Sequence, residues 1–274
     1  MITKYLPLVT VVALLATGIG VSCKKEDVNG FDPYAVNSVF VEFDNRVGDQ
    51  KMMLGKTPYK NGSGETFSVT TFNYFVSNIT LKNEQGTVVK FPDQYFLVRQ
   101  ADTLTQVIEL EDVPAGNYGE VSFTIGVDSL KSVGAPEDRT GVLDPTSYGE
   151  DSMYWSSTLG YIFLKLEGNS ASVPTTADAE HKFALQVGGY GGGWYGTAKT
   201  ANNLRRVSLP MTAKAMVRDA IAPTIHLVVD ALKIFDGPTK ISLSTTNSVQ
   251  SPALATPIAE NYKTMFKVDH VHNE

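Results

Sequence analysis

Cysteine is nearly absent from this 274-residue sequence, which has Cys23 as its one thiol. A single cysteine excludes an internal disulfide framework and a cysteine-based zinc finger. If Cys23 itself is modified, no thiol remains for a cysteine nucleophile either. The folded part of the chain must therefore be stabilised by packing of its apolar side chains.

Excess basic charge is also absent. Lysine and arginine total 23 against 29 aspartate and glutamate residues, so the formal net charge is −6. Nucleic-acid binding depends on basic patches that neutralise phosphates. The pair Arg205-Arg206 comes nearest to such a cluster, and two arginines at a strand end are more typical of a solvated edge. We expect no nucleic-acid partner.

Familiar catalytic motifs are missing as well. The sequence has no Gly-x-Ser-x-Gly elbow, no His-Glu-x-x-His and no Walker loop. Acidic residues gather between positions 128 and 155, but their spacing matches no calcium-binding loop. An enzyme would need a carboxylate pair assembled by the fold, such as Asp128 with Asp144. We expect that the protein is not an enzyme.

One long apolar run occurs, at residues 5–21, between Lys4 and Cys23. A basic residue, an apolar stretch and small residues before a cut site are the parts of a secretory signal. Residues 5–22 are at the lower limit for spanning about 30 Å of hydrocarbon, and Pro7, Gly18 and Gly20 fit a cleaved signal better. We therefore expect a signal peptide at 1–22 and a lipid on Cys23.

The residues after Cys23 extend this interpretation. The polar segment 23–37 is expected to be the lipidated cysteine and a tether to the membrane. Its charged start, residues 24–27, resembles the export tags of surface lipoproteins in Gram-negative bacteria. The expected location is the outer membrane, on its periplasmic or surface face.

From residue 38 onward, alternating apolar and polar residues predict strands with one buried face. The alternation is clear at 39–43, 121–127, 183–187 and 225–229, and turn signals separate the strands, among them Glu167-Gly168-Asn169. One helix is predicted near the end, capped by Thr256 with Pro257 in its first turn. The sequence predicts an all-β domain over 38–274, an antiparallel two-sheet β-sandwich with long loops and one short C-terminal helix.

The histidines are the best candidates for metal ligands. If the C-terminal tail is extended, His270 and His272 project to one side about 7 Å apart. His226 lies on a predicted strand, on the same face as Val228 and Asp230. Imidazole suits copper and zinc. A polar tail without metal is the alternative for the His-x-His pair.

A glycine-rich segment at 188–196 contains three aromatic residues, Tyr190, Trp194 and Tyr195. It lacks the Gly-Lys-Ser/Thr end of a phosphate-binding loop. The segment is either a wide turn or a contact surface. In the second case the protein is a metal-free surface module that binds a protein or glycan partner.

Several blocks resemble the MbnP-like family, secreted or lipid-anchored proteins associated with copper. The resemblance extends from about residue 39 to the C-terminus. The blocks include Phe72-Asn73-Tyr74-Phe75-Val76-Ser77-Asn78-Ile79, Val113-Pro114-Ala115-Gly116-Asn117-Tyr118, Met153-Tyr154-Trp155 and Ile258-Ala259-Glu260-Asn261-Tyr262.

This resemblance implies a β-rich domain, a copper site built from histidines, and a tryptophan, here Trp155, that a partner di-haem oxidase can oxidise. The lipoprotein branch has a second tryptophan where Ser157 stands. It also has histidines at the positions of Gln186 and Val228. Neither an amide nor a valine replaces imidazole as a good copper ligand, so the resemblance implies a diverged member with a weakened or lost family copper site.

Overall fold

The structure is a computed structural model that describes residues 31–55, 58–192 and 199–274. The predicted signal peptide, the expected lipidation site Cys23, and Trp194 and Tyr195 of the glycine-rich segment lie outside the described residues. In the described part of the chain, no helix is long and apolar enough to cross a membrane.

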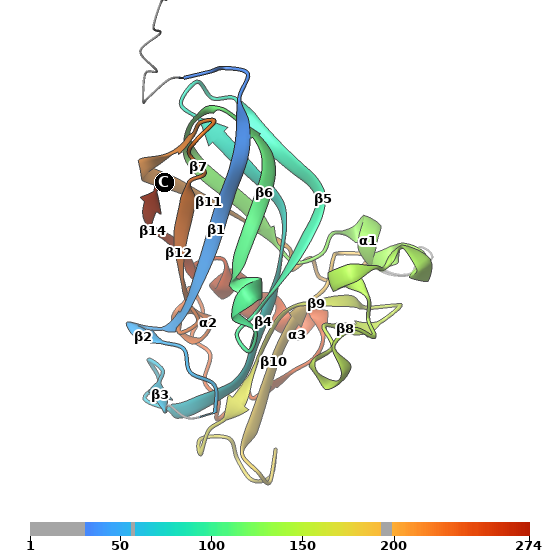
Figure 1. Cartoon of the computed structure of the whole chain (residues 1–274). Coiled ribbons are helices and arrows are strands. Elements are labelled where there is room, and N and C mark those ends of the chain that lie inside the picture. The colour runs from blue at the N-terminus through green and yellow to red at the C-terminus, as the bar shows by residue number, and fades with distance from the viewer. Residues whose placement is uncertain (1–30, 56–57, 193–198) are drawn as a thin grey trace, which may run out of the picture. The chain divides into compact units, whose positions relative to one another are not determined.

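Strands dominate the described residues and form two sheets (Figure 1). The smaller sheet has five strands in the order β14-β12-β1-β2, with β6 also paired to β1. Its members are β1 (Val36–Val47), β2 (Gln50–Lys51), β6 (Val107–Pro114), β12 (Thr224–Asp230) and β14 (Phe266–His272).

The larger sheet has nine strands and follows the order β11-β7-β4-β9-β10-β13, with β3 and β5 paired to β4, and β8 to β9. Its members are β3 (Tyr59–Lys60), β4 (Thr66–Asn83), β5 (Val88–Arg99), β7 (Gly116–Ile125), β8 (Tyr154–Ser156), β9 (Gly160–Asn169), β10 (Lys182–Gly188), β11 (Arg205–Val217) and β13 (Ser248–Val249).

The predicted two-sheet β-sandwich with a short C-terminal helix is confirmed. Most pairs are antiparallel, but β1 runs parallel to β12 and β10 parallel to β13. Both sheets are therefore mixed. The first parallel pair brings the start of the domain beside one of its last strands, which places β1 next to the candidate site described below.

The core lies between the sheets. Alternate residues of β1, Val39, Val41 and Phe43, are at most 1% exposed and face the larger sheet. Phe43 contacts the rings of Phe123 and Phe266 edge to face, at 6.0 and 6.5 Å between centroids. Each such buried side chain stabilises the fold by roughly 1.5–3 kcal/mol, so packing supplies the stability that disulfides do not.

Short helices fill the connections. They are α1 (Ser129–Val133), α2 (Lys233–Asp236), α3 (Pro252–Tyr262) and the 3-10 turns η1 (Thr103–Gln106), η2 (Pro136–Asp138), η3 (Gly141–Leu143) and η4 (Gly149–Asp151). The turns η2, η3 and η4 follow β7, in the expected long loop, and Val142 and Leu143 of η3 belong to a second apolar cluster around Phe75 and Tyr161.

The start of the C-terminal helix was predicted wrongly. Helix α3 begins at Pro252 after Ser251, and Pro257 lies inside it. The Thr256 hydroxyl does not cap the helix but donates to Asn203 Oδ1 at 3.0 Å. Ser251-Pro252 is a start signal of the same kind as Thr256-Pro257, and burial of Pro252 and Ala255 favours the earlier start.

Candidate metal centre

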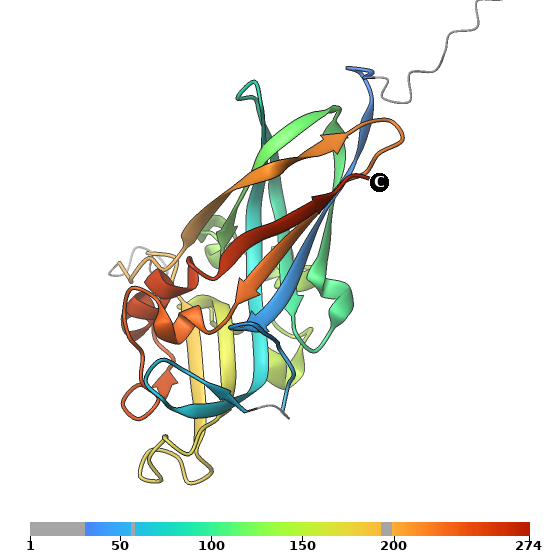
Figure 2. The same cartoon turned by 90° about the vertical axis from the view of Figure 1, so that its left-hand side faces the viewer.

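The candidate site lies on the outer face of the five-stranded sheet. In β12, Ile225 and Leu227 face the core, so His226 between them faces outward. The register places His226 beside Glu42 of β1 on one side and beside His270 of β14 on the other. Figure 2 shows β14, β12 and β1 side by side, with β12 between the other two.

A β-bulge shapes the β14 side of the site. The pairing of β12 with β14 shifts between His226 and Leu227, so that Asp269 is the extra residue between Val268 and His270. After the bulge, Val271 packs against the core. His272 therefore shares the outer face with His270, as the sequence pattern predicted.

The three imidazoles converge. One ring nitrogen from each of His226, His270 and His272 lies within 4.8 Å of the other two. His270 Nε2 and His272 Nε2 are 3.0 Å apart. The rings of His226 and His270 stack with centroids 4.3 Å apart. This spacing lets one ion contact all three nitrogens after small side-chain rotations.

Two carboxylates orient these rings. Glu42 Oε2 lies 2.9 Å from His226 Nδ1, and Asp269 Oδ2 lies 2.8 Å from His270 Nδ1. Each carboxylate occupies Nδ1, so Nε2 is the ring nitrogen left to contact a metal ion, and in His270 this atom now contacts His272 Nε2. Carboxylate–histidine pairs of this kind fix the ring tautomer and raise the basicity of a metal-binding nitrogen. Sequence reasoning missed Glu42 and Asp269; the alternation in β1 predicts that Glu42 faces outward but gives no sign that it lies beside His226.

The protonation state also suits metal binding. Burial lowers the pKa of His226, and the nearby His270 and His272 lower it further, while Glu42 opposes the change. The hydrogen bond from His270 lowers the pKa of Asp269. A neutral imidazole is the form that binds a metal ion. Three imidazoles fit copper or zinc better than calcium or magnesium.

Trp155 lies elsewhere. It belongs to β8, which pairs with β9 of the larger sheet, well away from β14 in Figure 1. Its indole Nε1 donates to Gln186 Oε1 at 2.8 Å, and Gln186 Nε2 donates to Glu167 Oε1 at 2.7 Å. The structure thus brings Trp155 to Gln186 and not to the histidines.

The two positions at which the resemblance implies histidines, 186 and 228, are also separated. Gln186 is in β10 of the larger sheet, whereas Val228 is in β12 of the smaller one, two residues from His226. Val228 pairs with Lys267 and is 4% exposed. A histidine at position 186 would contact Trp155 in the larger sheet. A histidine at position 228 would lie on β12, the strand of His226 in the smaller sheet.

Among its described side chains, the acidic segment 128–155 forms no comparable cluster. Asp128 caps α1 and accepts the Tyr95 hydroxyl, Asp144 accepts from Thr146, and Asp151 pairs with Arg99 at 3.1 Å. Each carboxylate has its own local partner. Within the described ranges, the three histidines are the group of metal-binding side chains that meets in space.

The family comparison agrees with this architecture. The family model described as MbnP matches residues 36–251. The structure of MbnP from Methylosinus trichosporium superposes with a TM-score of 0.53 at 13% identity, over 87% of this chain and 99% of that one. At this identity the likeness shows the fold. No curated protein matches the sequence. Because the family model spans more than half of it, the chain belongs to the MbnP family.

Proposed function

We propose that this protein is a lipid-anchored extracytoplasmic metal-binding protein, with copper as its metal and His226, His270 and His272 as the ligands. The observation that supports the proposal is the convergence of three ring nitrogens within 4.8 Å. Copper is favoured because imidazole is a good ligand for it. Among the divalent first-row transition metals, copper generally binds a given protein site with the highest affinity. The lipid on Cys23 keeps the protein at the outer membrane.

The site differs from the one that the resemblance implies. His270 and His272 lie beyond residue 251, outside the family match. Gln186 and Val228 supply no imidazole at the family positions, so copper binding there is weakened or lost. We propose that the C-terminal strand supplies the missing donors. Trp155 is then the residue on which a di-haem oxidase partner would act, away from the metal.

Titration calorimetry of the full-length chain in detergent, with copper and zinc, tests the proposal. One equivalent of copper is expected to bind. Replacing His226, His270 or His272 with glutamine should lower the affinity at least about 100-fold, since each metal–imidazole bond is a large part of the binding free energy. His181→Gln is the matched control, because His181 Nδ1 contacts Val173 O outside the cluster.

Two results would reject the metal site: no saturable copper binding, or equal affinity in all four variants. Metal content of protein purified without a tag or chelator gives a second readout. A metal-free protein that binds a protein or glycan through Trp194 or Tyr195 would favour the alternative surface module.

A further inference from the structure

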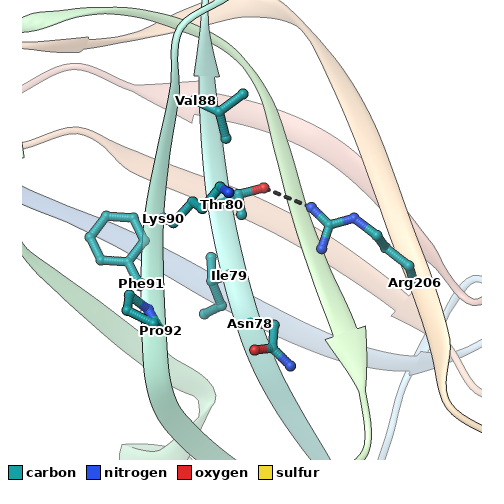
Figure 3. A pocket seen from close by; sticks show the side chains of 8 residues that line it. All are labelled: Asn78, Ile79, Thr80, Val88, Lys90, Phe91, Pro92 and Arg206. Atoms are coloured by element: carbon teal, nitrogen blue, oxygen red, sulfur yellow. Dashed lines mark hydrogen bonds between the residues drawn. The ribbon is translucent and has the colours of Figure 1, made fainter. Parts of the chain in front are cut away.

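A hollow lies on the outer face of the nine-stranded sheet, where β4 meets β5. It encloses about 330 Å³, and Ile79 and Phe91 form part of its wall. The other residues that line it are Asn78, Thr80, Val88, Lys90, Pro92 and Arg206 (Figure 3). Nothing in the proposed copper site involves these residues.

The hollow exists because the strand pairing is interrupted there. The register shifts on both sides of β4, between Ser77 and Ile79 against β5 and between Ser77 and Thr80 against β7. Asn78 and Asp93 both have positive φ, 51° and 57°, a conformation uncommon outside glycine. Bulges of this kind redirect side chains and are frequent beside functional sites.

Two cations border the hollow. Lys90 extends from β5 and Arg206 from β11 toward Thr80, and Arg206 Nη2 donates to Thr80 Oγ1 at 2.8 Å (Figure 3). The described residues that line the hollow include no carboxylate. Among the described residues, neither Lys90 nor Arg206 makes an ion pair. Two such cations together are unexpected in a chain of net charge −6.

The wall beside the cations is apolar. Val88 is 43% exposed, and Pro92 is exposed next to the buried Phe91. An inorganic anion would use the cations and leave this wall in water. A planar carboxylate matches the guanidinium fork of an arginine, and an attached apolar group would cover Val88 and Pro92. The volume is at the small end for ligand pockets.

We propose that this hollow binds a small organic carboxylate, with its anionic group between Lys90 and Arg206 and its apolar body against Val88 and Pro92. Thr80 holds Arg206 in position, and the Asn78 side chain offers a further polar contact. The ligand class is an aromatic or short aliphatic acid.

The test uses benzoate, neutral benzamide and inorganic phosphate as probes on the full-length chain in detergent, followed by calorimetry and by NMR shifts of backbone amides. Benzoate should bind saturably and shift amides of β4 and β5 near Asn78. Lys90→Met and Arg206→Met should each weaken it about tenfold, as expected for a charge-assisted hydrogen bond. Lys51→Met, which removes one exposed lysine on β2, should leave the affinity unchanged.

Unchanged melting temperatures would show that both exposed substitutions leave the fold intact. The proposal is overturned if benzoate does not bind, if benzamide binds equally well, or if all three variants retain full affinity. Phosphate binding as tight as benzoate binding would also overturn it, because the apolar wall would then contribute nothing.

Discussion

At the residue scale, the carboxylates beside the histidines are the most specific feature of the candidate site. Glu42→Gln removes the negative charge near His226 Nδ1 but keeps a hydrogen-bonding oxygen. Because such partners orient metal-binding rings, we expect copper affinity to fall 10- to 100-fold. Asp269→Asn should act in the same direction on His270. Competition with a coloured copper chelator measures both changes.

The control for this prediction is Glu109→Gln. Glu109 lies on β6 of the same sheet and accepts from the Ser38 hydroxyl at 2.6 Å, so its loss changes the net charge equally without touching a histidine. Equal loss of affinity in Glu109→Gln and Glu42→Gln would mean that only the overall charge matters, contrary to an orienting role.

At the element scale, local patterns predicted strands well and strand contacts poorly. A two-residue period identified the cores of β1, β7, β10 and β12 because each has one face on the core. The same period does not predict which strands are neighbours in a sheet. The parallel pairing of β1 with β12 joins segments about 180 positions apart, so the place of Glu42 beside His226 could not be predicted.

Gly168 shows how a local signal misleads. The sequence predicted a turn at Glu167-Gly168-Asn169, but Gly168 lies inside β9 and pairs with both Val69 and Phe183. The glycine is there because a Cβ would lie 1.8 Å from the Ser68 carbonyl oxygen. Glycine in a strand marks a close approach of two backbones as often as a turn.

Gly168→Ala should therefore destabilise the domain by about 3 kcal/mol or more, since the added Cβ would overlap the Ser68 backbone and the ring of Phe183, which is buried. Urea unfolding of the full-length chain measures the change. Gly116→Ala is the control, because the atoms nearest to a Cβ there belong to the Tyr118 side chain and lie at ordinary contact distances of 3.5 Å or more. If both variants lose the same stability, backbone crowding at Gly168 is not the cause.

At the scale of the whole molecule, the site joins parts of the chain that no local pattern connects. The spacing of His270 and His272 predicted that the two would share a face, and the extended β14 confirms it. Their meeting with His226 depends on the antiparallel pairing of β12 and β14. The bulge that adds Asp269 left no recognisable mark in the sequence.

The same cluster links global stability to pH. Burial, together with His270 and His272, lowers the pKa of His226 in the folded protein, and the nearby acids Glu42 and Asp269 compensate only in part. Below its unfolded value of about 6.5, the unfolded chain therefore binds more protons at this position than the folded one. The free energy of unfolding should fall as pH falls, and above that value the effect should vanish.

Urea unfolding of the metal-free full-length chain at pH 7.5 and pH 5.5 measures this linkage. His226→Gln keeps a side-chain donor for Glu42 but cannot titrate, so it should lose less stability on acidification than the native chain. His181→Gln, with the cluster intact, should lose as much as the native chain. Because the lowered pKa of His226 means that protonation opposes folding, an equal or larger acid loss in His226→Gln would show that the cluster does not control this response.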